Sequence, residues 1–195
     1  DMARNNHINN EIYIHDLSHY AVGDHNCLTI PFDDLLANGF NTRQTDVRPA
    51  QSVSTAFQLV AVIFQLQSLQ QFGGVSASHL DWTMIPYVRK SFSKHFKDGL
   101  KYCCESSEDY INRVPNELSF DDIEANDKRN EKAYQYAMDM TTKEVYQAVE
   151  GMYHNLNTLQ SRSGNQLPFT SINYGTCTLP EGRLIIKALL EVSIN

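Results

Sequence analysis

The chain has 195 residues, an apolar fraction of 42% and a formal net charge of −7. This length and composition allow one domain with a sizeable hydrophobic core. The negative charge argues against a general nucleic-acid-binding surface, although a nucleotide, which needs only a few local donors, remains possible.

No secretory signal is recognisable at the N-terminus, and the longest strongly apolar run, residues 59–64, is too short to cross a bilayer. The cysteines show no Cys-x-x-Cys spacing, so we expect no zinc site within the chain. Thiols and a reducing, cytoplasmic compartment are therefore expected. The cysteines are Cys27, Cys103, Cys104 and Cys177.

Short strands and helices alternate in the first third of the chain. Glu11 to His15 alternates apolar and polar residues, which predicts a strand. His15, His19 and His25 could suggest a metal site, but histidines that hydrogen-bond the backbone at a strand end are the favoured interpretation. The other elements expected here are a strand at 26–30, a helix at 32–40 ended by Gly39, and a long helix at 52–72 ended by Gly73-Gly74.

The remaining chain is mostly helical. Basic residues follow the helix predicted at 81–102, where a solvated helix face is the alternative to a binding surface. Residues 103–130 are acidic and rich in turn formers, which indicates a surface excursion. The capping-box spacing of Thr141 and Glu144 predicts a new helix start. The helices expected are 81–102, interrupted near Pro86, then 131–140, 141–160 and 180–193.

The stretch from Asn155 to Cys177 combines a helix end, a polar loop at 161–165 and a strand at 168–174. Alternation puts Phe169, Ser171, Asn173 and Gly175 on one strand face, opposite Thr170, Ile172 and Tyr174. A face of hydroxyl and amide groups beside a glycine-bearing loop suits a phosphate or a sugar. A connection whose polar groups only satisfy the backbone remains the alternative.

These residues also carry a resemblance to the catalytic subunit of the anaerobic (class III, glycyl-radical) ribonucleoside-triphosphate reductases. It extends over nearly the whole chain and is weakest at about 102–130. Motifs in the same order are far more specific than any one of them. They are Ile12-Tyr-Ile-His-Asp16, Asn26-Cys27, Leu35-Leu-Ala-Asn-Gly-Phe40, Gln71-Phe-Gly-Gly74 and Gln160 to Gly175.

The resemblance implies a helix-rich α/β fold, part of a ten-stranded α/β barrel built of two half-barrels. We expect residues 1–195 to be a segment of the first half-barrel, with both ends cut from a longer polypeptide. It also implies a homodimer with no membrane and no nucleic-acid partner.

The implied activity is the reduction of ribonucleoside triphosphates to deoxyribonucleoside triphosphates under anoxia. In the family a separate S-adenosylmethionine iron–sulfur activase makes a glycyl radical, which passes to a loop cysteine, and formate commonly supplies the reducing equivalents. The full-length enzymes also carry a structural zinc and bind ATP and dNTP effectors. None of these cofactor motifs is visible in this sequence.

The resemblance assigns site residues as well. Cys27 matches the second cysteine, which partners the radical-bearing cysteine, and Lys94 is carried over as an effector phosphate contact. Cys177 is taken as structural. The residues expected on the substrate side are Asn26, Ser163, Gly164, Gln166, Thr170, Ser171 and Asn173.

Two other functions are kept open. One is another glycyl-radical enzyme of the pyruvate formate-lyase type, with the same barrel and an acyl substrate. The other is a non-catalytic nucleotide-binding or scaffolding helical domain. The Asn26-Cys27 pair and the Asn-Gln-x-Pro-Phe-Thr-Ser pattern that begins at Asn165 favour the reductase.

Overall fold

The computed structural model describes residues 2–14, 27–42, 44–70, 73–122, 128–160 and 166–194, and for residues 128 and 129 the backbone alone. Helices dominate, and a small parallel sheet makes the fold α/β. The helices are α1 Met2–Ile8, α2 Phe32–Asn38, α3 Val53–Ser68, α4 Leu80–Thr83, α5 Ile85–Tyr102, α6 Glu108–Arg113, α7 Lys128–Thr158 and α8 Pro180–Ile194. The strands are β1 Leu28–Thr29, β2 Phe40–Asn41, β3 Asp46–Val47, β4 Val75–Ala77 and β5 Thr170–Ile172.

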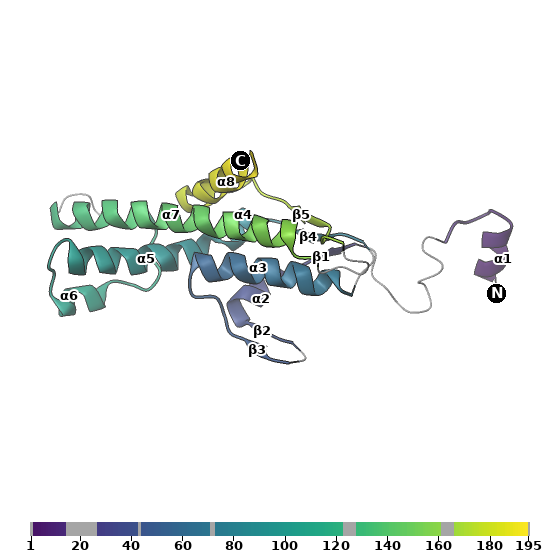
Figure 1. Ribbon diagram of the computed structural model, residues 1–195, viewed down its shortest axis with the longest axis horizontal. Helices are drawn as coiled ribbons and strands as arrows, with labels where there is room; N and C mark the ends of the chain where they lie inside the picture. The colour runs from purple at the N-terminus through teal and green to yellow at the C-terminus, as the bar shows by residue number, and fades with distance from the viewer. Residues whose placement is uncertain are drawn as a thin grey trace.

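Helices α3 and α5 follow one another along one side of the long helix α7, as Figure 1 shows. Helix α7 has 31 residues and is therefore about 46 Å long. Its core face packs against both α5 and α3, and the Tyr134 ring packs edge-to-face on Phe92 of α5. Its buried apolar side chains are Ala133, Ala137, Val145, Ala148, Val149, Met152 and Leu156.

Helices α5 and α7 approach each other closely at Gly99. A Cβ atom at this position would lie 2.9 Å from the Cα atom and 3.0 Å from the carbonyl oxygen of Ala133. Both of these are backbone atoms, which cannot move aside as a flexible side chain can. The absence of a side chain at Gly99 therefore sets the spacing of the two helices.

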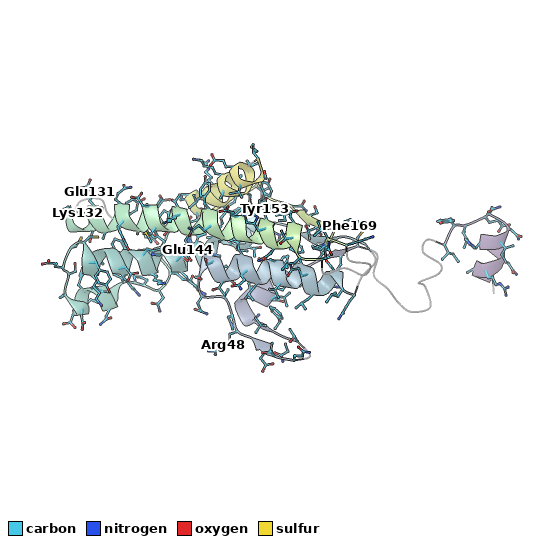
Figure 2. All side chains as sticks on the ribbon, viewed as in Figure 1. Arg48, Glu131, Lys132, Glu144, Tyr153 and Phe169 are labelled. Atoms are coloured by element: carbon cyan, nitrogen blue, oxygen red, sulfur yellow. The ribbon has the colours of Figure 1, made fainter. Side chains whose placement is uncertain are left out.

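A polar pair joins the helices near the middle of α7. Glu144, labelled in Figure 2, lies 2.9 Å from His95 Nε2 on α5. Burial alone would raise the pKa of Glu144, but the hydrogen bond and charge of His95, with hydrogen bonds from Ser91 and the Ser54 backbone, hold this pKa below its usual value. The partly buried carboxylate thus has partners on both helices that α7 covers.

Strands β1, β4 and β5 form a parallel sheet in that order. Leu28 pairs with Val75, which pairs with Thr170, and the next row joins Thr29, Ser76 and Ser171. Ile30, Val75 and Ala77 are buried on one face of this sheet, which lies in the core. Strands β2 and β3 form a separate antiparallel hairpin.

The structure corrects several expectations. Residues 11–14 form no strand; they belong to a turn in which Glu11 N and Ile12 N both donate to Asn6 O. No helix starts at Thr141, because α7 runs through it and Thr141 is buried. Without glycine or proline nearby, continuing the helix costs less than nucleating a new one. Leu159, which falls inside the helix expected at 141–160, lies beyond the end of α7 at Thr158 and is exposed.

Other expected boundaries are confirmed. Ser52 caps α3 by accepting a hydrogen bond from Thr55 N, and Gly39 ends α2 with a φ of 74°. Met84 separates α4 from α5, so Pro86 falls in the first turn of α5, where its missing N–H is harmless. Residues 103–122 contain the short helix α6 in an otherwise irregular excursion. Within the described residues, no helix has both the length and the apolar character needed to cross a membrane.

We predict opposite effects for two glycine-to-alanine changes on the helices. Gly99→Ala should lower the free energy of unfolding by about 1–3 kcal/mol, because the methyl group meets the Ala133 backbone. Gly151→Ala on α7 should raise it by about 0.5–1 kcal/mol, because a Cβ there has no neighbour within 4 Å and alanine favours the helix. Urea unfolding followed by circular dichroism measures both. Equal effects at the two positions would contradict the close approach of α5 and α7.

Candidate functional site

One face of the parallel sheet lies outside the core and carries hydroxyl groups. Thr29, Ser76 and Ser171 stand side by side in one register row. The Thr29 Oγ1 and Ser76 Oγ atoms are 2.8 Å apart and share a hydrogen bond. Since side chains alternate along a strand, Cys27 and Phe169 belong to the same face. The sheet thus presents a thiol and hydroxyls together.

A pocket of about 670 Å³ lies over the start of these strands. Cys27, Ser76 and Ser171 line it from the sheet, and Asn157 lines it from the last turn of α7. Cys27 is exposed. Figure 2 shows Phe169, which also lines the pocket, at the end of the body where the strands gather. The volume suits a nucleotide-sized ligand.

Some of the residues expected on the substrate side lie on the same sheet face as Cys27, and others do not. Ser171 and Asn173 are exposed and, by alternation, share the face of Cys27. Thr170 lies on the opposite strand face, half-buried, and lines both this pocket and a second one between α7, β5 and α8. Gln166 is exposed and does not line the pocket wall that the described residues form. Asn26, Ser163 and Gly164 lie outside the described residues.

Sequence reasoning missed β4, the central strand, and with it Ser76. The prediction that Gly73-Gly74 ends the helix expected at 52–72 is wrong, because α3 ends at Ser68 with its C-cap at Leu69. Gly74 lines the pocket, and a Cβ there would lie 3.4 Å from Phe169 O, so the strands meet closely at this point. The run Val75-Ser-Ala77 is too short for periodicity to reveal it, since three residues fit a strand and a loop equally well.

Asp81, the second residue of α4, holds the chain that leaves β5. Its Oδ2 atom accepts hydrogen bonds from Gly175 N, Thr176 N and Cys177 N at 3.0, 3.1 and 2.9 Å. The carboxylate is fully buried. The neighbouring Trp82 Nε1 donates to Thr176 Oγ1 at 3.0 Å. These bonds fix the exit of β5 against the helix that follows β4, and nothing in the sequence indicated them.

Cys177 is buried next to this anchor. A Cβ on Gly182 would lie 2.3 Å from its Sγ atom, so the thiol fills the space above the first turn of α8. This placement agrees with the expected structural role. Among the described residues, no three His, Cys, Asp or Glu side chains gather as a metal site would require. His15, His19 and His25 lie outside that part of the chain.

Lys94 lies in a different pocket, of about 380 Å³, on the outer side of α5. Lys90 and Lys97 line the same pocket, together with Gln51 before α3 and Asn116 after α6. Asp98 contributes a carboxylate, so amines outnumber carboxylates in the wall. The structure therefore gathers the basic residues that the sequence had placed along one helix, and it makes them a candidate anion site.

Helices that back a small parallel sheet, with a pocket at one sheet face, define an α/β fold. The sequence model of the anaerobic ribonucleoside-triphosphate reductase family matches residues 1–195, and the chain belongs to this family. The match does not favour the pyruvate formate-lyase alternative or a non-catalytic helical domain.

Curated relatives agree. An anaerobic ribonucleoside-triphosphate reductase of Enterobacteria phage T4 is 28% identical over 94% of this chain and 26% of its own length. The protein of that name from Haemophilus influenzae is 27% identical over 97% of the chain and 23% of its own length. The one from Escherichia coli is 26% identical over 95% of the chain and 22% of its own length. The chain thus spans about a quarter of the length of these relatives.

Removal of the Asp81 carboxylate should destabilise the segment that leaves β5. Asp81→Ala leaves three backbone N–H groups without their acceptor, so we expect a loss of about 3 kcal/mol in unfolding free energy. Asp139→Ala, which removes an exposed carboxylate from α7, should change it by less than about 0.5 kcal/mol. Guanidinium unfolding of both variants compares them, and equal losses would show that Asp81 does not hold the chain after β5.

Proposed function

We propose that this chain forms part of the catalytic domain of an enzyme that reduces ribonucleoside triphosphates to deoxyribonucleoside triphosphates under anoxia. Membership of the family supports this activity. The observation that carries the proposal is the single pocket lined by the Cys27 thiol and by hydroxyls of β4 and β5. Such a site brings a redox-active group within reach of a sugar held by hydrogen-bond donors and acceptors.

The proposed domain architecture is the ten-stranded α/β barrel, with this chain in its first half. Strands β1, β4 and β5 are parallel, and helices connect them along the chain. Parallel strands with helical crossovers are the units from which α/β barrels are built. In the described sheet, β1 and β5 are the outer strands, so each has an edge to which a further strand could be added.

Each residue has a definite part in this proposal. Cys27 would be the second cysteine of the reaction, partnering the cysteine that carries the radical. Ser76 and Ser171 would hydrogen-bond the ribose or phosphate oxygens, and Asn157 would contact the ligand from α7. Asn26, Ser163, Gly164, Gln166, Thr170 and Asn173 remain proposed substrate residues from the resemblance.

The remaining machinery would come from outside this chain. A glycyl radical made by an S-adenosylmethionine iron–sulfur activase would supply the hydrogen-abstracting species, and formate the reducing equivalents. A structural zinc, ATP and dNTP effectors, a homodimer and a cytoplasmic location complete the proposal. The chain's own residues would bind the nucleotide, orient its ribose toward Cys27 and supply one thiol.

Cys27→Ser in the complete gene product should abolish nucleotide reduction and leave nucleotide binding and glycyl-radical formation nearly unchanged. Serine is close to cysteine in size, so packing changes little, but a hydroxyl cannot share a disulfide radical with another cysteine. Nucleotide binding, the radical's paramagnetic resonance spectrum and product formation are measured on one anoxic preparation. Cys103→Ser changes an exposed thiol that does not line the pocket and should keep full turnover. Turnover of Cys27→Ser within a few-fold of the parent would make Cys27 a structural residue.

Lys94→Ala should weaken the binding of dNTP effectors. A charge-assisted contact to phosphate is worth about 1.5–3 kcal/mol, which corresponds to about 10–150-fold in dissociation constant. Lys143→Ala, which removes an exposed lysine of α7, should change it less than about twofold. Equilibrium titration with each dNTP measures both variants. Unchanged constants for Lys94→Ala would remove the effector assignment from this pocket.

A further inference from the structure

The segment 114–120, which follows α6, lies along the basic side of α5. Ser93 Oγ donates a hydrogen bond to Pro115 O, and Lys97 Nζ donates one to Asn116 Oδ1 at 2.8 Å. Glu117 Oε1 is 3.6 Å from Lys90 Nζ. This segment belongs to the part of the chain that resembles the reductases least. It nevertheless contacts two of the three lysines that line the Lys94 pocket.

The segment is anchored beyond these contacts. Leu118 and Phe120 are buried, and the Phe120 ring packs edge-to-face on Phe92 of α5, with the ring centroids 4.9 Å apart. Leu118 N donates to Arg89 O at 3.4 Å. Asn116 and Glu117 are therefore held next to α5 by neighbours that lie in the core.

A buried carboxylate completes the anchor. Glu181 Oε1 accepts hydrogen bonds from Arg89 Nε at 2.9 Å, Ser119 Oγ at 2.8 Å and Phe120 N at 3.3 Å. Burial alone would raise the pKa of Glu181, but the hydrogen bonds of Arg89 and Ser119 and the charge of Arg89 hold this pKa below its usual value. The segment is thus tied to α5 and to the first turn of α8 by one ionised group.

Positive charges outnumber negative charges around the Lys94 pocket. Helix α5 carries Arg89, Lys90, Lys94, Lys97 and Lys101 against one acidic residue, Asp98, in a chain whose net charge is −7. Among the described residues, no carboxylate pairs with Lys94, whereas Lys90 pairs with Glu117 and Lys97 meets only a neutral amide. The Lys90 side chain is 25% exposed and that of Glu117 is 51% exposed, so solvent and ligand reach both.

We propose that the Glu117 carboxylate competes with anionic ligands for the lysines of the Lys94 pocket. It thereby lowers the affinity of the pocket for a polyphosphate. The carboxylate partly neutralises Lys90 and repels an anion that approaches Lys94 and Lys97. Asn116 accepts a hydrogen bond from Lys97 without adding a charge. Glu117 is therefore the residue through which the segment lowers the affinity for an anion. This inference rests on the proposed role of Lys94 as an anion contact, and it assigns a function to the excursion.

The test is calorimetric titration of the complete gene product with inorganic tripolyphosphate and with dATP at low ionic strength, where surface charges are least screened. Glu117→Gln should bind both ligands about two- to fivefold more tightly than the parent, as expected for removal of one exposed like charge. Asn116→Asp should bind them more weakly by a similar factor. Thermal unfolding of each variant is compared with the parent, so that a loosened segment is recognised.

Two controls separate a local effect from a general one. Glu108→Gln makes the same charge change on α6, away from the pocket wall, and should leave both dissociation constants within about twofold. In a Lys90→Gln background, Glu117→Gln should have a smaller effect, because the part that comes from neutralising Lys90 is gone and only the direct repulsion of the anion remains. Equal increases in ligand affinity from Glu108→Gln and Glu117→Gln would overturn the proposal.

The outcomes also distinguish this inference from the effector assignment. Binding that depends on Lys94 but not on Glu117 would overturn the competitor role and keep the effector site. Tight binding that is insensitive to Lys94→Ala would remove both from this pocket. If the parent binds too weakly to measure, Glu117→Gln should bind measurably. If neither the parent nor Glu117→Gln binds at millimolar ligand, both the competitor role and the effector assignment are overturned.

Discussion

Helix α7 crosses the place where the first turn of α3 meets α5, at the hydrogen bond from Val53 N to Ser91 Oγ, and its burial against both helices holds them in line (Figure 1). Against α5 the contact surface includes Ala133, which lies directly on Gly99, and Tyr134, whose ring packs edge-to-face on Phe92. Further along α7, larger side chains such as Val149 and Met152 are buried. A buried residue of that size contributes about 1.5–3 kcal/mol, so this one face supplies much of the stability of the helical layer.

The sheet and its pocket depend on that layer. Strand β4 directly follows α3 and lies between β1 and β5, so the position of α3 places the sheet. Asp81 then ties the chain leaving β5 to α4, which follows β4. One sheet face is consequently buried, and the other carries Cys27 beside the hydroxyls of Ser76 and Ser171. A rigid support of this kind would keep the thiol in a fixed position relative to a ligand in the pocket.

A second consequence concerns the charge of α5. The helix buries its apolar side against α7, and its basic residues are therefore left on the outer side, where segment 114–120 meets them. The excursion is anchored by Phe120 and by the buried Glu181, not by its acidic residues. Its charged residues thus remain available to act on whatever ligand the lysines attract.

The sequence by itself determined the elements whose cause is local. Ser52 and Gly39 set helix boundaries because a hydroxyl caps free N–H groups and glycine tolerates a positive φ. Apolar spacing located the long helices, and the ordered motifs identified the family and singled out Cys27. Only the tertiary structure decided that Thr141 lies inside a continuous helix, that Val75–Ala77 is the central strand, and that Asp81 anchors the end of β5. It also brought Asn116 and Glu117 to the lysines of α5. These features depend on contacts between residues distant in the chain, whose free energy of packing and hydrogen bonding overrides short-range preference and leaves no periodic trace in the sequence.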